Sequence, residues 1–151
     1  MNNLSGQTIG RYHILEQFGQ GGMAVVYKAY DTRLERDVAF KLIRTDEIPP
    51  AQVERLMIRF EREAKAQASF NHPNIIPVFD YGQTDGFPYL VMAYISGGTL
   101  KQKTGQPVDL QTALGWLIPI ADAIAYAHQN GVIHRDIKPS NILFDQSRPM
   151  L

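Results

Sequence analysis

Short apolar runs separated by turn signals occupy much of the first half of the chain. The runs YHILEQF, MAVVYKAY and VAFKLI follow one another and are separated by GQGG and DTRLERD. Such runs, rich in β-branched and aromatic residues and bounded by glycine or charged turns, are typical of antiparallel strands. Two further runs, IIPVFDYG and FPYLVMAYI, are joined by the turn QTDG. The pattern therefore predicts five antiparallel strands in two groups.

Two later stretches carry the period of a helix. The first runs from about Ala51 to Phe70 and is closed by NHPN, and the second runs from about Leu110 to His128 and stops at Asn130-Gly131. Pro119 lies inside the second pattern, so that helix is either kinked at the proline or begins there with the proline in its first turn.

Together these elements predict an α+β fold. A β-rich lobe with one helix is followed by the hinge signal SGG and by the beginning of a mostly helical lobe. We place an N-terminal tail at residues 1–11, the first lobe at residues 12–95 and the incomplete second lobe at residues 96–151.

The composition narrows the functional classes. With 15 basic and 15 acidic residues among 151, the chain has no net charge, which argues against nucleic-acid binding. The absence of cysteine excludes disulfides and thiolate metal sites and suits a reducing compartment. No leader pattern opens the chain, and the longest apolar stretch, about residues 114–127, is interrupted and too short to span a membrane. We therefore expect a cytoplasmic location and no membrane segment in this chain.

A glycine cluster in FGQGGMAVV, from Phe18 to Val26, lies at the bend between two predicted strands. Small residues let backbone amides approach phosphate oxygens, which a side chain would obstruct. The strand-to-strand setting argues against a dinucleotide-binding fold, and the missing Lys-Ser/Thr pair argues against a Walker-type loop. Taken alone, the segment is more typical of a tight turn.

Lys41 lies between apolar neighbours on a predicted strand, in VAFKL. A buried ammonium needs a counter-charge, although strand lysines usually face solvent. Glu63 lies at the margin of the apolar stripe of the first helix, where its carboxylate could reach inward. Spacing alone does not distinguish Glu63 from Glu61 as the partner.

The octet HRDIKPSN, residues 134–141, carries the most specific chemistry. Asp136 can accept a proton from a hydroxyl nucleophile, and Lys138 can neutralise charge on a transferring phosphoryl group. Asn141 offers a carbonyl oxygen to Mg²⁺. We interpret His134 as a structural residue because the motif gives it no reacting partner. The whole octet favours phosphoryl transfer over a chance loop.

The glycine loop, the strand lysine, the helix glutamate and the octet, in this order and spacing, resemble the protein kinases from Tyr12 to Leu151. The segments FEREAKAQASFNHPNII and AHQNGVIHRDIKPSNIL look most like bacterial eukaryotic-like Ser/Thr kinases. Lys138 favours Ser/Thr over tyrosine kinases, and small-molecule phosphotransferases, whose loop usually reads His-Gly-Asp, fit less well. The resemblance implies a protein-kinase-like fold and transfer from MgATP to Ser or Thr hydroxyls of a protein substrate.

The resemblance also implies a role for each matching residue. The glycine loop would cover ATP with Phe18, Gly19, Gly21, Gly22, Ala24 and Val26. Lys41 would hold the α- and β-phosphates and pair with Glu63. The adenine would meet Ala39, Met92 at the back of the pocket, and the backbone from Ala93 to Ile95. Asp136 would be the catalytic base, Lys138 the phosphate contact and Asn141 a magnesium ligand, while Arg135 implies regulation through an activation loop.

Three departures from the family pattern change what we expect of this chain. Ala24 replaces the third glycine and Ala93 stands where the family often has glutamate, and both changes are expected to be tolerated. The chain ends where the family presents Asp-Phe-Gly, so turnover by this chain alone is expected to collapse. We therefore expect a kinase fragment, such as the cytoplasmic part of a longer membrane-anchored kinase.

The alternative is a catalytically dead fragment that binds a nucleotide or a partner. An uncovered apolar stripe on the second helix also favours self-association.

Overall fold

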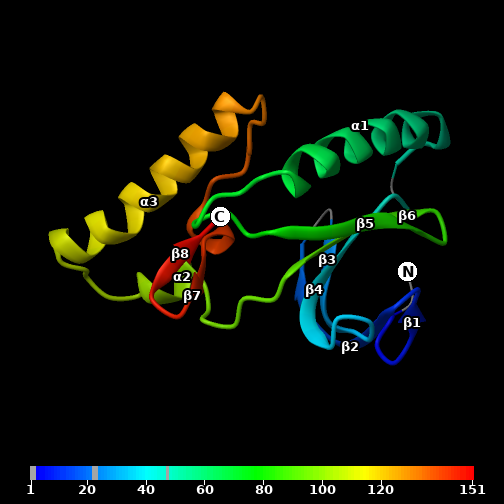
Figure 1. Cartoon of the computed structure of the whole chain (residues 1–151), viewed down its shortest axis with the longest axis horizontal. Helices are drawn as coiled ribbons and strands as arrows, with labels where there is room; N and C mark the ends of the chain where they lie inside the picture. Colours follow the sequence, from blue (N-terminus) through cyan, green and yellow to red (C-terminus); the bar gives the residue numbers. More distant parts are fainter. Residues whose placement is uncertain (1–2, 22–23, 47) are drawn as a thin grey trace. The chain divides into compact units, whose positions relative to one another are not determined.

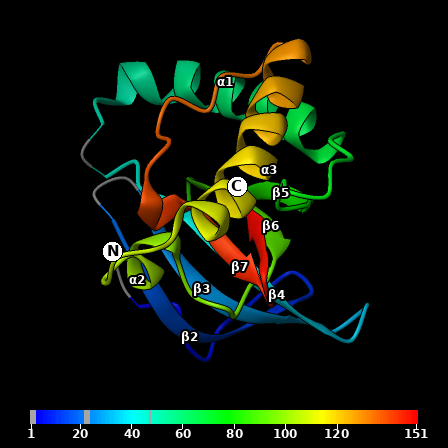
Figure 2. The ribbon, with the colours of Figure 1, turned by 90° about the vertical axis from the view of Figure 1, so that its left-hand side faces the viewer.

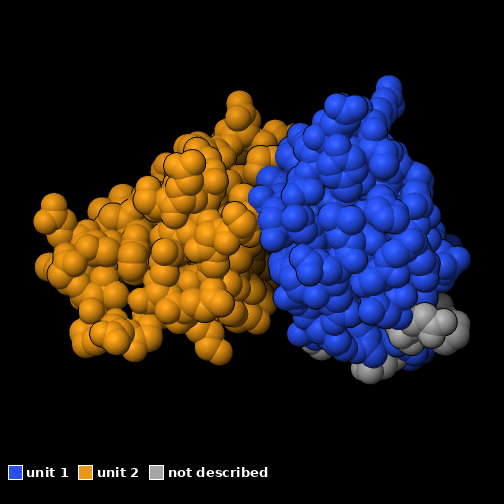
Figure 3. Space-filling model, turned by 90° about the horizontal axis from the view of Figure 1, so that it is seen from below, with its two compact units in different colours: residues 1–68, 78–94 blue, residues 69–77, 95–151 orange. Residues whose placement is uncertain are grey.

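The structure is a computed structural model that describes residues 3–21, 24–46 and 48–151. It forms two compact units, coloured separately in Figure 3. Unit 1 comprises Met1–Ala68 and Val78–Tyr94, and unit 2 comprises Ser69–Pro77 and Ile95–Leu151. Unit 1 differs from the predicted lobe of residues 12–95 because it also includes residues 1–11, whereas residues 69–77 and Ile95 belong with unit 2.

An antiparallel sheet forms the framework of unit 1 (Figure 1). Its strands, within the described residues, run in the order β1-β2-β3-β4-β6-β5. They are β1 (Thr8–Ile9), β2 (Tyr12–Gln20), β3 (Ala24–Asp31), β4 (Arg36–Ile43), β5 (Val78–Thr84) and β6 (Phe87–Ala93). The last five correspond to the predicted strands, whereas β1 lies in the predicted N-terminal tail.

Strand β1 and the residue Leu4 show that the tail folds onto the sheet. Thr8 and Ile9 pair with His13 and Tyr12, and Leu4 is only 9% exposed among core residues. Two strand residues between Gly6 and Gly10 are too few to produce a recognisable alternation, which explains why the sequence pattern does not predict β1.

The turn between β5 and β6 is the one that the sequence QTDG predicts. Asp85 and Gly86 have φ angles of 49° and 81°. Positive φ at both central residues defines the tight hairpin turn whose twist matches that of the flanking strands, and Asp-Gly is a favoured pair for it. The turn places Thr84 opposite Phe87 and so sets the register of this edge hairpin.

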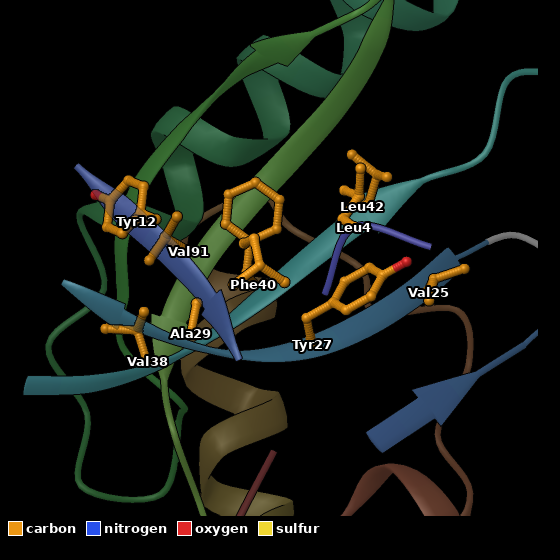
Figure 4. Close-up of a cluster of buried hydrophobic side chains, with 10 residues drawn as sticks. Leu4, Tyr12, Val25, Tyr27, Ala29, Val38, Phe40, Leu42 and Val91 are labelled. Carbon is orange, nitrogen blue, oxygen red and sulfur yellow. The ribbon is translucent and has the colours of Figure 1, made fainter. Parts of the chain in front are cut away.

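The core of unit 1 occupies one face of the sheet (Figure 4). Strand β3 contributes alternate residues and β4 contributes their cross-strand partners: Val25, Tyr27, Ala29, Val38, Phe40 and Leu42. Phe40 is fully buried, with its ring stacked on Tyr89 at 4.6 Å between centroids. Because side chains alternate along a strand, the intervening residues of β3 and β4 project from the opposite face.

Helix α1 (Pro50–Ala68) packs against β5 and β6. The predicted helical stretch from about Ala51 to Phe70 is thus confirmed within two residues at its carboxyl end. Ala64, from the predicted apolar stripe, is 1% exposed.

Unit 2 combines helices with a short hairpin (Figure 2). Its elements are α2 (Leu100–Lys103), α3 (Leu110–Gln129), the 3₁₀ turn η1 (Pro139–Asn141), β7 (Leu143–Asp145) and β8 (Arg148–Met150). A second core unites α2, α3 and the hairpin through Leu100, Ile120, Ile142 and Phe144.

Helix α3 has clear capping signals at both ends. The Asp109 carboxylate accepts a hydrogen bond from the Thr112 amide at 2.9 Å, and Gly131 takes the left-handed conformation after the last turn, with φ of 75°. The helix begins at Leu110 and includes Pro119, which excludes a start at the proline.

The predicted apolar stripe of α3 is exposed at Leu110, Leu114, Leu117 and Ile118. Among the described residues, α3 is the one helix that is long and apolar enough to cross a membrane, and core helices of water-soluble proteins share these two properties.

Candidate active site

The register of the sheet places predicted nucleotide-binding residues together. Val26 on β3 lies opposite Lys41 on β4, and Ala39 on β4 lies opposite Met92 on β6. Direct cross-strand partners share a face of an antiparallel sheet. This face, opposite the core, is called the site face below and is defined by Val26, Ala39, Lys41 and Met92. Ala39 is 5% exposed, and the other three are half-buried.

The glycine bend adjoins the same row of residues. Gly19 on β2 pairs with Val26, and a β-carbon at Gly19 would lie 3.6 Å from the Val26 side chain. The Gly21 amide donates a hydrogen bond to the Ala24 carbonyl at 2.8 Å, which closes the bend. Gly22 lies outside the described residues. Gly19 therefore lies beside the site face, and the role of the glycine segment as a phosphate loop stays a prediction.

Aromatic residues connect the glycine bend to the end of β6. The rings of Phe18 and Tyr94 meet edge to face, with centroids 5.7 Å apart, and Lys28 Nζ lies 5.0 Å from the Tyr94 centroid. The sequence predicts only a backbone contact at Tyr94, so this contact between side chains is an addition from the structure. An aromatic residue directly after an apolar strand was the available signal.

Ala93, a predicted backbone contact, lies at the end of β6. It pairs with Val38, a core residue, so its side chain lies on the core face of the sheet. This placement supports the expectation that alanine is tolerated where the family often has glutamate. Ile95, the other predicted contact near here, follows in unit 2.

Glu63 on α1 has a local partner in this structure. Its carboxylate accepts a hydrogen bond from Arg59 Nε at 2.9 Å, in an exposed ion pair one helical turn apart. Glu61, the competing candidate, pairs instead with Lys65 at 2.8 Å. The pairing of Glu63 with Lys41 stays a prediction. The i,i+4 spacing of Arg59 and Glu63 in the sequence is a signal for this local pair.

The catalytic octet brings its three predicted residues into contact. Lys138 Nζ lies 2.8 Å from Asp136 Oδ2, and Asn141 Nδ2 donates to the same oxygen at 2.8 Å. A second bond joins Asn141 Nδ2 to the Asp136 carbonyl at 2.8 Å. The turn η1 makes this closure geometrically feasible because it returns the chain toward Asp136 within five residues.

The backbone around Asp136 is also constrained. The Asp136 amide donates to His134 Nδ1 at 3.3 Å, which agrees with a structural role for that histidine. Arg135 has a φ of 64°, a left-handed conformation that residues with a β-carbon adopt rarely and that often occurs at functional sites.

The neighbours of Asp136 lower its pKa below the ordinary value. The largest cause is the hydrogen bond from the Lys138 ammonium, followed by the one from the Asn141 amide. The carboxylate is therefore ionised at neutral pH and can accept a proton from a hydroxyl group. Both contacts use Oδ2, so a substrate hydroxyl is expected to approach Oδ1.

The candidate metal ligand fits a hard cation by its chemistry. The two side-chain hydrogen bonds given above for Asn141 use its amide nitrogen Nδ2, and a carbonyl oxygen is the atom that Mg²⁺ binds. Across residues 3–21, 24–46 and 48–151, no group of three or more histidine or acidic side chains could hold a metal. The magnesium assignment therefore rests on the octet.

Comparisons with known proteins identify the family of the chain. The model of the protein kinase domain matches residues 12–151. Serine/threonine-protein kinase PrkC of Bacillus subtilis is 46% identical over 138 residues, covering 90% of this chain and 21% of PrkC. Serine/threonine-protein kinase PknB of Mycobacterium tuberculosis is 41% identical over 139 residues, covering 88% of this chain and 22% of PknB.

Solved structures give the same result. The apo form of PpkA-294 matches with a TM-score of 0.83 and 31% identity, over 97% of this chain and 59% of that one. The PknI kinase domain of Mycobacterium tuberculosis matches with a TM-score of 0.84 and 29% identity, over 100% of this chain and 62% of that one.

The fold and the matched residues define a protein kinase catalytic domain. The chain belongs to the protein kinase domain family, and the two relatives named above, PrkC and PknB, are bacterial Ser/Thr kinases. It spans about a fifth of the length of those relatives and about three fifths of the solved kinase chains.

Proposed function

We propose that the chain carries the nucleotide-binding lobe and the catalytic loop of a bacterial-type Ser/Thr protein kinase. The observation that carries the proposal is the convergence of Lys138 and Asn141 on the Asp136 carboxylate. One residue to accept a proton, one cation to meet a phosphoryl group and one amide oxygen for Mg²⁺ are what phosphoryl transfer to a hydroxyl group requires.

The proposed reaction uses ATP and a Ser or Thr hydroxyl of a protein substrate. The hydroxyl oxygen forms a bond to the γ-phosphorus while the bond between that phosphorus and the bridging oxygen of ADP breaks. The hydroxyl proton passes to Asp136, and Lys138 offsets the charge of the phosphoryl oxygens. Magnesium, when bound, would neutralise phosphate charge, and Asn141 would be one of its ligands. A cytoplasmic location belongs to the same proposal.

The site face supports the nucleotide part of the proposal. Val26 and Ala39 offer apolar surface for the adenine, and Lys41 offers a cation within the same cross-strand rows. Gly19 and Gly21 place backbone beside these rows, where a phosphate could approach. The aromatic pair of Phe18 and Tyr94 adds further apolar surface at one end.

Thermal unfolding of the 151-residue chain, with and without MgATP, tests nucleotide binding. A ligand at one hundred times its dissociation constant stabilises the folded state by about 2.7 kcal/mol. We expect a clear increase in melting temperature that Lys41→Met reduces and Asp136→Asn preserves. Lys65→Met, which alters an exposed lysine of α1, is the matched control and should behave as the unsubstituted chain does.

Transfer is tested with γ-labelled ATP and a mixed protein substrate on a chain extended to a full kinase domain, because turnover by the 151-residue chain alone is expected to collapse. Label on Ser or Thr that disappears in Asp136→Asn would support the kinase assignment. Nucleotide binding without transfer would instead favour the binding-only alternative for this chain. If Asp136→Asn removed nucleotide binding as fully as Lys41→Met does, the role of Asp136 as a base would be contradicted.

A further inference from the structure

Strand β2 carries a bulge at Phe18, directly before the glycine bend. Its pairing with β3 passes from Gln17 opposite Tyr27 to Gly19 opposite Val26, which leaves Phe18 as an extra residue of β2. A bulge frees the side chain of the extra residue from the regular alternation, and bulges are frequent beside active sites. Phe18 is 50% exposed although it lies within a strand. The contacts of its ring therefore help to determine where the glycine bend begins.

The ring of Phe18 contacts the ring of Tyr94, which follows β6 directly. The two rings meet edge to face, with centroids 5.7 Å apart and planes at 84°. In the order of the described strands, β3 and β4 lie between β2 and β6. The contact of the two rings therefore joins the start of the glycine bend to the end of β6 across two intervening strands, and all of these parts belong to unit 1.

An ion pair between β3 and β4 supports the Tyr94 ring. Lys28 Nζ lies 5.0 Å from the centroid of that ring and 2.9 Å from Asp37 Oδ2. Lys28 lies opposite Ala39 and so projects from the site face, as does Asp37, two residues before Ala39. An ammonium group over an aromatic ring is attracted to its π electrons. The four residues Phe18, Tyr94, Lys28 and Asp37, called the edge cluster below, thus form one chain of contacts.

The ion pair of the edge cluster is partly open to solvent. The Lys28 side chain is 25% exposed and that of Asp37 is 42% exposed. The hydrogen bond to Asp37 is the largest cause that raises the pKa of Lys28, so the lysine is charged at neutral pH. Because ion pairs near the surface contribute little to folding, substitutions here should act on the local arrangement of the rings.

We propose that Tyr94, Lys28 and Asp37 are positioning residues for the nucleotide site. The Tyr94 ring holds Phe18, and with it the glycine bend, beside the site face, and the pair of Lys28 and Asp37 holds the Tyr94 ring. These three side chains act through Phe18 and need not touch the nucleotide themselves. The inference deepens the proposed function and rests on it, since it assigns a role only if the glycine bend covers ATP.

The proposed role requires a ring at residue 94 and a cation at residue 28. An edge-to-face contact and a cation over a ring both need the aromatic face, whereas neither needs the tyrosine hydroxyl. Arginine can replace lysine in both contacts, because its guanidinium group pairs with carboxylates and stacks on rings. Conservative variants should therefore keep the function that leucine or methionine removes.

The experiment measures the MgATP dissociation constant by calorimetry for the 151-residue chain and its variants. We expect Tyr94→Leu and Lys28→Met to weaken binding by about three- to tenfold. Tyr94→Phe and Lys28→Arg should bind MgATP as the unsubstituted chain does. Lys65→Met, which removes a lysine that also pairs with a carboxylate on the surface of unit 1, is the matched control and should leave the constant unchanged.

A double-substitution cycle tests whether Tyr94 and Lys28 act through Phe18. In a chain that carries Phe18→Leu, adding Tyr94→Leu or Lys28→Met should cause no further loss of MgATP affinity, because the ring that they hold is already absent. A merely structural defect would add its own loss to that of Phe18→Leu.

Unchanged MgATP affinity in both Tyr94→Leu and Lys28→Met would overturn the proposal, and so would additive losses in the cycle. Should Tyr94→Leu fail to fold, Lys28→Met in the two backgrounds still decides, because Lys28 lies in a partly exposed ion pair. If the unsubstituted chain bound no MgATP, the proposed function itself would fail and this inference with it. Additive losses in a chain that binds MgATP would contradict the positioning role alone.

Discussion

The backbone of the site face is held by hydrogen bonds between neighbouring strands, and a packed core lies on the opposite side of the sheet. The side chains that project from this face are those of Val26, Ala39, Lys41 and Met92. In the catalytic loop, Asp136, Lys138 and Asn141 are placed by contacts between their own polar groups, and the side chains of Asp136 and Lys138 are more than half exposed. Substitutions on the site face should therefore leave its geometry intact, whereas substitutions in the catalytic loop should rearrange the loop.

The largest expected effect is on the core behind the site face. Phe40 is fully buried and stacks on Tyr89, so Phe40→Ala should lower the free energy of unfolding by about 3–5 kcal/mol through lost burial and a cavity. Urea denaturation measures this change. Phe18→Ala, at a half-exposed phenylalanine, is the matched control and should cost at most about 1 kcal/mol. Equal losses in the two variants would contradict the view that the core positions the site face.

A smaller effect is expected in unit 2, where the backbone at Gly97 lies close to the backbone at Phe144. A β-carbon at Gly97 would lie 2.1 Å from the Phe144 carbonyl oxygen, which also accepts the Gly97 amide at 3.0 Å. Gly97→Ala should therefore destabilise unit 2 by about 2–4 kcal/mol, because backbone must move to relieve the clash. Urea denaturation followed by the fluorescence of Trp116 measures this change, because the Trp116 ring packs beside Phe144 in unit 2.

The matched control for Gly97→Ala is a glycine with space around it. Gly115 lies within α3 and has no atom within 4 Å of an added β-carbon, so Gly115→Ala should stabilise the helix by up to about 1 kcal/mol. Opposite signs for the two variants are the expected result. A Gly97→Ala chain as stable as the unsubstituted one would show that the 97–100 and 142–144 segments separate easily.

The smallest effect concerns the charge of the catalytic loop. The Lys138 hydrogen bond is the largest cause of the lowered pKa of Asp136, so Lys138→Met should raise that pKa toward its ordinary value of about 3.9. A carboxyl group whose pKa is lower in the folded chain than in the unfolded chain stabilises the folded state at pH values above its unfolded-state pKa. This stabilisation is lost as the pH falls below about 4 and through the pKa of Asp136 in the folded chain.

Carboxyl ¹³C spectra recorded during an acid titration measure the pKa of Asp136 directly. Asn141→Leu should raise it less than Lys138→Met, because the Asn141 bond is the second cause. Lys101→Met, which removes an exposed lysine of α2, should leave it unchanged. An unchanged pKa in Lys138→Met would show that the loop does not depend on contacts among its side chains.

Local patterns predicted those parts of the fold that depend on nearby residues. Alternation indicated β2 to β6, and capping signals indicated the end of α3 at Asn130-Gly131. The hairpin of β7 and β8 was not predicted because each strand has only three residues, too few for a periodic signal. The membership of residues 69–77 in unit 2 was not predicted either, since it depends on contacts with residues about 50 to 75 positions away.

The same distinction applies to the site. The octet could be identified from the sequence because its residues lie within one loop and their types define the chemistry. The shared face of Val26 and Lys41 follows from pairing register, which local sequence fixes only in part. The i,i+4 spacing in the sequence is enough to predict that Arg59 pairs with Glu63. The contact of His72 with Asp122 joins residues 50 positions apart and is seen only in the tertiary structure.

The assignment of residues 69–77 to unit 2 has a practical consequence for dissecting this protein into two expressed pieces. A cut between Tyr94 and Ile95 would leave Asn74 and Ile76 on the first piece and their hydrogen-bond partners Pro149 and Leu151 on the second. The two pieces would therefore each carry half of a buried interface. Reassociation of such pieces when mixed, rather than independent folding of either, is what this chain path favours.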